Sequence, residues 1–160
     1  MPALIKLAAQ VLSALIVIKF GIKIDNLDIP YLNLSNASPI FYTLLTLCWI
    51  VGITNAMNLI DGLDGLSTGI SMISCLSLLI IFSLNQSPLI SIVLITALGG
   101  ALCGFLPYNF NPAKTFIGDT GSNFLGFCLS IISILGIAKT YTAIVIVAPL
   151  FVLALPIFDT

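Results

Sequence analysis

Residues Gly65 to Ala113 read GLSTGISMISCLSLLIIFSLNQSPLISIVLITALGGALCGFLPYNFNPA, and this stretch contains no Asp, Glu, Lys or Arg. A helix that crosses a lipid bilayer needs about 20 mostly apolar residues. The stretch is long enough for two such helices, and the turn residues NQSP at positions 85–88 divide it. It therefore predicts two antiparallel membrane spans joined by a short turn.

The rest of the chain has a similar composition. Hydrophobic residues make up 59% of the 160 residues and charged residues only 7%, with a formal net charge of −1. A soluble domain usually carries about 25% charged residues. A second uncharged stretch, from Ile29 to Ile60, has room for a further span. We therefore expect an integral membrane protein that contacts the lipid bilayer. No basic stripe indicates a nucleic-acid partner, and the absence of His removes imidazole chemistry from this chain.

We predict an all-α fold: one polytopic transmembrane helix bundle over residues 1–160, with about six spans. The expected spans are Lys6–Ile24, Ile40–Thr54, Leu66–Leu84, Leu89–Leu106, Gly121–Ile137 and Tyr141–Ile157. The second is short if it ends at Thr54, and continuation to Met57 is the alternative. Because successive spans alternate in direction, the connections Asn55–Gly65 and Pro107–Thr120 return to the same membrane face, together with Lys6 and Asp159. The positive-inside rule does not orient the chain, because its five Lys are divided between the two faces.

The first polar connection contains Asn55, Asn58, Asp61 and Asp64, spaced three residues apart. A carboxylate at the centre of a membrane helix costs about 2.5–3.5 kcal/mol, so this concentration indicates a cation, a polar ligand or water. Oxygen ligands without thiol or imidazole suit a hard cation such as Mg²⁺ or Mn²⁺. Ordinary helix capping by Asn and Asp is the alternative, and it accounts for only one or two of the four polar groups.

The second polar connection contains Phe116 and the turn Gly118-Asp119-Thr120-Gly121, which we expect to precede the next span. Pro107 is expected to break the preceding helix. Asp119 is either a functional carboxylate or only an N-cap. Phe116 can stack on a base or serve as a membrane-interface anchor. On composition alone, Lys6 fits a snorkelling residue at a span end.

The two connections carry the motifs NAMNLIDGLDGLSTG at residues 55–69 and FNPAKTFIGDTGSNFLGF at residues 110–127. Together they resemble the polyprenyl-phosphate N-acetylhexosamine-1-phosphate transferases, of glycosyltransferase family 4 type. The string PIFDT at residues 156–160 is similar to the branch specific for GlcNAc. The resemblance implies that a polyprenyl phosphate attacks the β-phosphorus of a UDP-N-acetylhexosamine and releases UMP. It also implies an Mg²⁺ cofactor and an active site at the cytoplasmic face of the bacterial plasma membrane.

The resemblance assigns roles residue by residue. Asn58 and Asp119 match metal ligands, and Asp61 and Asp64 match positions that shape the nucleotide-sugar pocket. Asn55 belongs to the same substrate-binding motif. Phe116 matches an aromatic that packs against uracil, and Lys6 matches a residue that contacts the diphosphate. Asp61, Asp64 and Asp119 are the expected catalytic carboxylates.

Two family motifs, an Asp-Asp pair before Lys6 and a later His-rich motif, have no counterpart in these residues. We therefore expect the chain to be truncated at both ends relative to the family, and inactive or nearly so on its own. A cation-coupled secondary transporter and an assembly subunit are the alternatives from other classes. The products expected of the family are cell-wall or surface polysaccharides such as teichoic acid or lipopolysaccharide. The sequence leaves the oligomeric state open, with a homodimer as one alternative.

Overall fold

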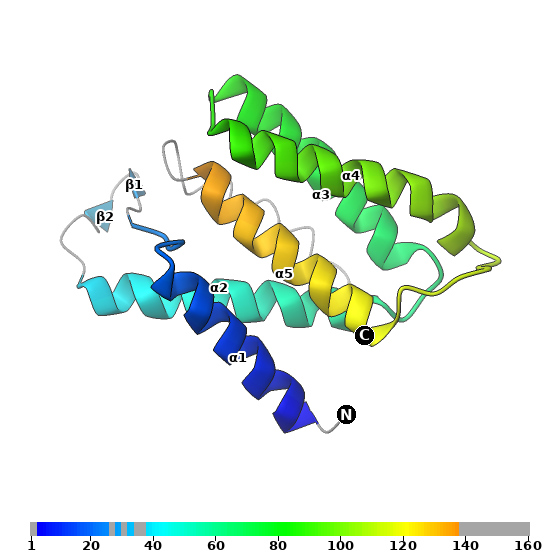
Figure 1. The fold of residues 1–160 in the computed structure, drawn as a ribbon, viewed down its shortest axis with the longest axis horizontal. Helices are drawn as coiled ribbons and strands as arrows, with labels where there is room; N and C mark the ends of the chain where they lie inside the picture. Colours follow the sequence, from blue (N-terminus) through cyan, green and yellow to red (C-terminus); the bar gives the residue numbers. More distant parts are fainter. Residues whose placement is uncertain (1–2, 26–27, 30–31, 34–37, 138–160) are drawn as a thin grey trace.

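The computed structural model describes residues 3–25, 28–29, 32–33 and 38–137. Within them, five helices account for nearly all regular structure (Figure 1). The elements are α1 (Ala3–Lys19), β1 (Asp28–Ile29), β2 (Leu32–Asn33), α2 (Pro39–Ile60), α3 (Leu66–Leu84), α4 (Leu89–Asn109) and α5 (Gly118–Ile137). β1 and β2 form a short antiparallel pair in which Asp28 faces Asn33. The prediction of an all-α bundle is confirmed.

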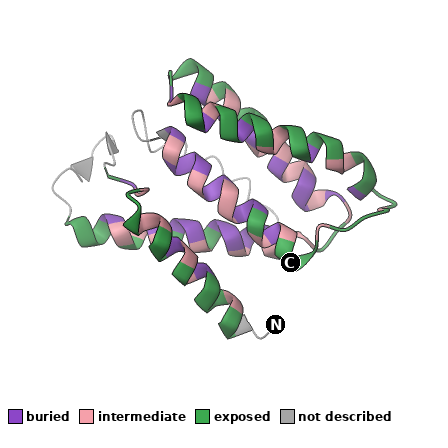
Figure 2. Ribbon diagram, in the orientation of Figure 1, coloured by how far each residue is buried: buried purple, intermediate pink, exposed green. Residues whose placement is uncertain are grey.

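Helix α2 is the centre of the bundle. It packs most extensively against α5, while α1 lies on another side of it and α3 pairs with α4 as a hairpin (Figure 1). Buried residues are concentrated along α2 and α5, whereas the outer side of α4 is largely exposed (Figure 2). The core includes Ile50, Met57, Phe82, Leu125 and Leu129. This arrangement holds the last turns of α2 beside the first turns of α5.

Among the described residues, four helices are long and apolar enough to cross a membrane: Pro39–Ile60, Leu66–Leu84, Leu89–Asn109 and Gly118–Gly136. Their outer faces carry exposed large side chains such as Leu76, Ile80 and Val93. Hydroxyl groups in these helices often donate back to their own helix, as Ser77 does to the carbonyl of Ile73, which satisfies them without water. The chain is therefore a multi-pass membrane protein.

Five of the six predicted spans fall in the described residues, and four of these five correspond to helices long and apolar enough to cross a membrane. Helix α1 has 17 residues and ends at Lys19, rather than continuing to Ile24. Gly21 has φ +88°, and the N–H groups of Gly21 and Ile22 donate to the carbonyls of Ile18 and Val17. These two bonds are those of a Schellman C-cap, which needs a left-handed residue and so favours glycine. The predicted span Tyr141–Ile157 lies outside the described residues.

Other helix boundaries also differ from prediction. Helix α2 continues six residues beyond Thr54 to Ile60, and Asp61 is its C-cap. Helix α4 passes through Pro107 to Asn109; the proline lies in the last turn, where the N–H of Phe110 still donates to the carbonyl of Leu106 at 2.8 Å. Proline removes a single backbone donor, so the helix survives there. Asn55 and Asn58 therefore lie on a helix and not in a loop.

Helix α5 begins at Gly118, three residues before the predicted start. Asp119 consequently stands in the first turn of α5 instead of in a preceding turn. A carboxylate in this position interacts favourably with the positive end of the helix dipole. The helix also crosses α2 closely, because a Cβ added at Gly126 would lie 2.8 Å from the Cα of Thr54. Only glycine allows the two backbones to approach this far.

Candidate functional site

Three charged and amide side chains meet at one end of the bundle, and each comes from a different helix. Lys6 Nζ on α1 lies 2.9 Å from Asp119 Oδ2 on α5 and donates to Asn58 Oδ1 on α2 at 2.9 Å. Asn58 Nδ2 in turn lies 3.4 Å from Asp119 Oδ1. We call Lys6, Asn58 and Asp119 the ionic layer. The prediction that Lys6 and both polar connections share one face is confirmed, while Asp159, predicted on the same face, lies outside the described residues.

The ionic layer is open to solvent on the side of Asp119. The Asp119 side chain is 75% exposed, whereas that of Lys6 is 23% exposed. An exposed ion pair contributes little to the stability of the fold. A gain in stability therefore does not explain why these groups converge. Ser122 makes a further contact with the ionic layer. It is fully buried, and its hydroxyl accepts from Asn58 Nδ2 at 2.9 Å. The result is an accessible carboxylate and amide oxygen beside an ammonium group.

The donor set suits a hard divalent cation. Mg²⁺ is usually held by one or two carboxylates and completes its coordination with water and substrate phosphates. Asp119 supplies an exposed carboxylate, and Asn58 supplies an amide oxygen in contact with the same Lys6. Among the described residues there is no group of three or more His, Cys, Asp or Glu that could enclose a metal. The side chains therefore fit a cation that shares its coordination with a bound ligand.

Asp61 and Asp64 make their hydrogen bonds elsewhere. Asp61 Oδ1 accepts from Ser67 Oγ at 2.6 Å, close to the start of α3. Asp64 Oδ2 accepts from the backbone N–H of Ala113 at 3.1 Å, which ties the α2–α3 connection to the α4–α5 loop. In this structure Asp64 thus holds a loop in place. Its predicted role in shaping a pocket is compatible with that contact, since the same loop carries Phe116.

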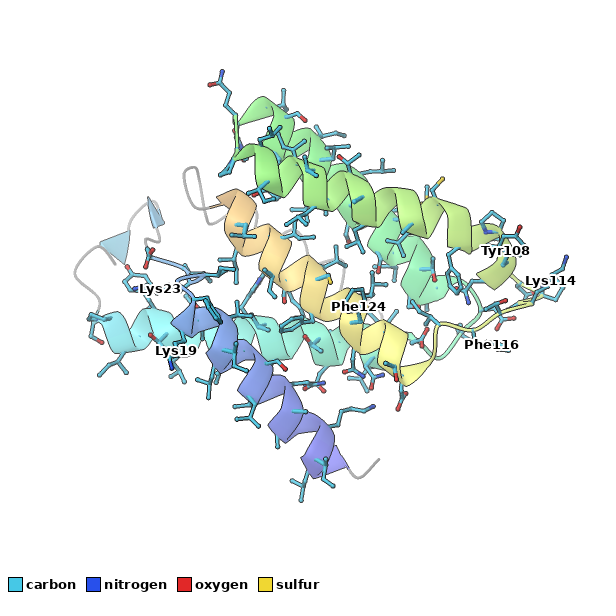
Figure 3. All side chains as sticks on the ribbon, viewed as in Figure 1. Lys19, Lys23, Tyr108, Lys114, Phe116 and Phe124 are labelled. Atoms are coloured by element: carbon cyan, nitrogen blue, oxygen red, sulfur yellow. The ribbon has the colours of Figure 1, made fainter. Side chains whose placement is uncertain are left out.

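The loop that joins α4 to α5 presents Phe116 to solvent, with 71% of the residue exposed. Figure 3 shows Tyr108, Lys114 and Phe116 gathered at the same end of the molecule, far from Lys19 and Lys23. Below the loop, the buried Asn109 accepts from Thr68 Oγ1 at 2.6 Å and donates to the carbonyl of Thr115 at 2.9 Å. Hydrogen bonds therefore hold the backbone beside Phe116 and leave its ring accessible.

A groove of about 510 Å³ opens between α1 and α5, with α2 at its floor. Lys6 and Asp119 line it together with Gln10 and Asn123, and the aromatic side chains of Phe124 and Phe127 complete the lining. The groove therefore joins a charged site to an apolar surface. Such a shape fits an amphiphilic ligand that has an anionic head and an apolar tail.

Sequence reasoning missed several polar residues of this region: Gln10, Ser67, Thr68, Asn109, Ser122 and Asn123. The spacing gave a partial signal. Gln10 follows Lys6 by four residues and Asn123 follows Asp119 by four, which places each pair on one helix face. The role of Ser122 depends on α5 beginning at Gly118, and no pattern in the sequence indicated that start.

These features agree with a comparison of the sequence with known protein families. The model of glycosyl transferase family 4 matches residues 1–137. The chain belongs to glycosyl transferase family 4. The matched range includes the five described helices and every residue of the ionic layer.

Two relatives within family 4 illustrate its range. The chain is 43% identical over 158 residues to the probable undecaprenyl-phosphate N-acetylglucosaminyl 1-phosphate transferase of Bacillus subtilis (strain 168), covering 99% of this chain and 44% of the relative. It is 44% identical over 110 residues to the phospho-N-acetylmuramoyl-pentapeptide-transferase of Staphylococcus haemolyticus (strain JCSC1435), covering 69% of this chain and 34% of that relative. The chain thus spans less than half the length of the curated relatives it matches.

Proposed function

We propose that the protein containing this chain transfers N-acetylglucosamine 1-phosphate from UDP-N-acetylglucosamine to a polyprenyl phosphate and releases UMP. The observation that carries the proposal is the ionic layer, in which the Lys6 ammonium lies 2.9 Å from both the Asn58 amide oxygen and the Asp119 carboxylate. The Asn58 amide nitrogen lies 3.4 Å from the same carboxylate. The match over 99% of the chain to a relative named for that transfer supports the choice of sugar. The phospho-N-acetylmuramoyl-pentapeptide-transferase matches only 69% of it.

In the proposed reaction, a phosphate oxygen of the polyprenyl phosphate forms a bond to the β-phosphorus of the UDP-sugar. The bond from that phosphorus to the bridging oxygen breaks, and the oxygen leaves with UMP. Negative charge grows on the leaving oxygen, so a positive group beside the diphosphate lowers the barrier. Lys6 supplies such a group: its ammonium turns from Asp119 towards the diphosphate when the substrate binds.

Asn58 and Asp119 would hold the divalent cation, for which we propose Mg²⁺, with Mn²⁺ as a substitute. When bound, the cation supplies Lewis-acid polarisation of the phosphoryl oxygens. Phe116 offers its exposed ring for the uracil base, since stacking on an aromatic contributes about 1–3 kcal/mol per base. Asp64 holds the Phe116 loop through Ala113. The nucleotide thus lies over the α4–α5 loop and its diphosphate over the ionic layer.

The acceptor would enter through the groove between α1 and α5. Its phosphate lies at the Lys6 end and its apolar chain follows the surface of Phe124 and Phe127 towards the lipid. We place this site at the cytoplasmic face of the bacterial plasma membrane, where UDP-sugars are available. A cation-coupled transporter fits less well, because the ionic layer is gathered at one end of the bundle and not near the middle of the membrane.

Product analysis tests this function. The complete protein, purified in detergent, is incubated with undecaprenyl phosphate, Mg²⁺ and either UDP-N-acetylglucosamine or UDP-N-acetylmuramoyl-pentapeptide. We expect UMP and a lipid diphospho-N-acetylglucosamine from the first donor and little product from the second. Lipid product from the pentapeptide donor alone would assign the other sugar, and release of UDP instead of UMP would overturn the phosphoryl transfer. The 160-residue chain by itself is expected to bind UMP without turning over UDP-N-acetylglucosamine.

A further inference from the structure

A second set of polar side chains lies one helical turn below the ionic layer, on the same three helices. Gln10 follows Lys6 on α1, Asn55 precedes Asn58 on α2, and Asn123 follows Asp119 on α5. The spacing is three or four residues in each case, which stacks the residues of one helix above each other. We call Gln10, Asn55 and Asn123 the amide layer. Like the ionic layer, the amide layer brings together one side chain from each of α1, α2 and α5, but its side chains are neutral.

Gln10 is the centre of the amide layer. Its Nε2 donates to Asn123 Oδ1 at 2.7 Å and approaches Asn55 Oδ1 at 3.4 Å, while its Oε1 accepts from Asn55 Nδ2 at 2.7 Å. Only 8% of Gln10 is exposed. Both ends of this one amide are therefore used, and they connect α1 to α2 and to α5 at the same depth.

The amide layer is also connected to the ionic layer. Asn123 Nδ2 donates to the backbone carbonyl of Asp119. The path from Gln10 to the first turn of α5 therefore consists of two consecutive hydrogen bonds. Gln10 is thereby linked to the backbone that carries the Asp119 carboxylate.

Few described residues of α1 lie close to α5. Helix α1 packs mainly on α2, and the groove opens between α1 and α5. Several large side chains of α1, including Leu12, Leu15 and Ile16, are exposed. Within the described part of the chain, the side-chain hydrogen bonds from α1 to α5 come from Lys6 and Gln10, and the Lys6 bond must open when a diphosphate takes the ammonium. Gln10 then remains as the connection across the groove.

We propose that Gln10, with Asn123, is a positioning residue that fixes the rotation and depth of α1, so that Lys6 stays at the ionic layer when its ammonium turns from Asp119 to the diphosphate. This inference rests on the proposed function for its kinetic part and on geometry alone for its structural part. Partners that orient a catalytic group typically change activity by 10–100-fold when they are removed. The effect should appear in kcat, because Gln10 stands outside the site proposed for the nucleotide and acts through Lys6.

The kinetic experiment uses Gln10→Leu in the complete protein, with Ser77→Ala as the control. Ser77 lies on α3, outside the lining of the groove, and its hydroxyl donates to the Ile73 carbonyl of its own helix at 2.9 Å. Activity per folded protein is measured with UDP-N-acetylglucosamine and undecaprenyl phosphate. We expect kcat to fall at least about tenfold in Gln10→Leu, with KM for the UDP-sugar changed less than about threefold. Ser77→Ala should retain wild-type kcat. Equal kcat in Gln10→Leu and Ser77→Ala would overturn the proposal.

Hydrogen–deuterium exchange provides a readout that does not depend on activity. We expect faster amide exchange over residues 118–124 in Gln10→Leu, with unchanged exchange in the α3–α4 hairpin. Asn123→Ala should give the same local pattern, and the double variant should add little to either single variant. Uniformly faster exchange in both single variants would indicate a merely structural role and contradict the proposal. Local exchange changes in a protein without any transferase activity would instead overturn the proposed function and leave the positioning role intact.

Discussion

Lys6 and Asp119 are 113 positions apart in the chain, yet Lys6 Nζ donates to Asp119 Oδ2 at 2.9 Å. Helix α2 makes this contact possible, because α1 packs on one side of it and α5 on another. Asn58, near the end of α2, contacts both side chains. The chemistry proposed for this protein depends on this meeting of three helix ends.

Replacing Lys6 by Met tests the positive charge at the proposed diphosphate site. Met keeps a long apolar stem that can occupy the same path, but it cannot neutralise a developing phosphate charge. Transfer from UDP-N-acetylglucosamine is expected to fall about a hundredfold. Lys23→Met is the control, because Lys23 forms an exposed ion pair with Asp25 at 3.0 Å, away from the site. Similar rates in the two variants would remove Lys6 from the reaction.

Asp64 is predicted to act by holding the α4–α5 loop. Asp64→Asn retains an oxygen that can accept from the N–H of Ala113, whereas Asp64→Ala leaves that donor unpaired. A lost hydrogen bond of this kind costs about 1–3 kcal/mol. Isothermal titration of UMP should therefore give near-normal affinity for Asp64→Asn and clearly weaker binding for Asp64→Ala. A loss of affinity that is equal in the two variants would assign the carboxylate charge, and not the hydrogen bond, to this role.

Phe116 and Phe124 should affect different substrates. Both rings are largely exposed, but Phe116 stands on the α4–α5 loop and Phe124 lines the groove. Phe116→Leu is expected to weaken UMP binding about tenfold, in line with the loss of base stacking. Phe124→Leu should leave UMP binding unchanged and raise the KM for undecaprenyl phosphate. The account of the groove fails if Phe124→Leu alters UMP affinity and leaves the acceptor KM as it was.

The close approach of α2 and α5 predicts a strong effect for a very small substitution. Gly126→Ala would place a methyl group 2.8 Å from the Cα of Thr54 and 3.0 Å from the carbonyl oxygen of Ile53. Since these atoms belong to the backbone, the helices must separate, at a cost of about 1–3 kcal/mol. Thermal unfolding in detergent should show a lower midpoint for Gly126→Ala. Gly104→Ala, which meets nothing within 4 Å, should be neutral or slightly stabilising.

Much of the fold was predictable because hydrophobic stretches and turn residues set the spans. Helix α3 has the predicted bounds Leu66–Leu84, since Gly65 and Asn85 flank a long apolar run. The alternation of spans also placed Lys6, Asn58 and Asp119 on one face, as the structure confirms. Helix ends were less predictable: Gly21 ends α1 through a C-cap whose bonds depend on conformation, and Pro107 is tolerated in a last turn.

The sequence identified candidate residues of the site, but it did not predict the hydrogen bonds that connect them. Asp64 attracts attention as a carboxylate in an apolar chain, but its bond to the Ala113 backbone depends on how two loops meet. Gln10 and Asn123 are neutral and lie inside apolar helices, so composition gave no reason to join them. Their pairing requires the relative rotation of α1 and α5, which helical periodicity alone does not specify.

The most direct test follows the phosphorus itself, with UDP-N-acetylglucosamine radiolabelled at the β-phosphate and undecaprenyl phosphate as acceptor. The complete wild-type protein should move the label into the lipid fraction in a Mg²⁺-dependent manner. Asp119→Asn, which keeps the shape of the side chain and removes its charge, should fold normally and lose this transfer, while Asp25→Asn at the other ion pair should retain it. Wild-type transfer of label by Asp119→Asn would contradict the account.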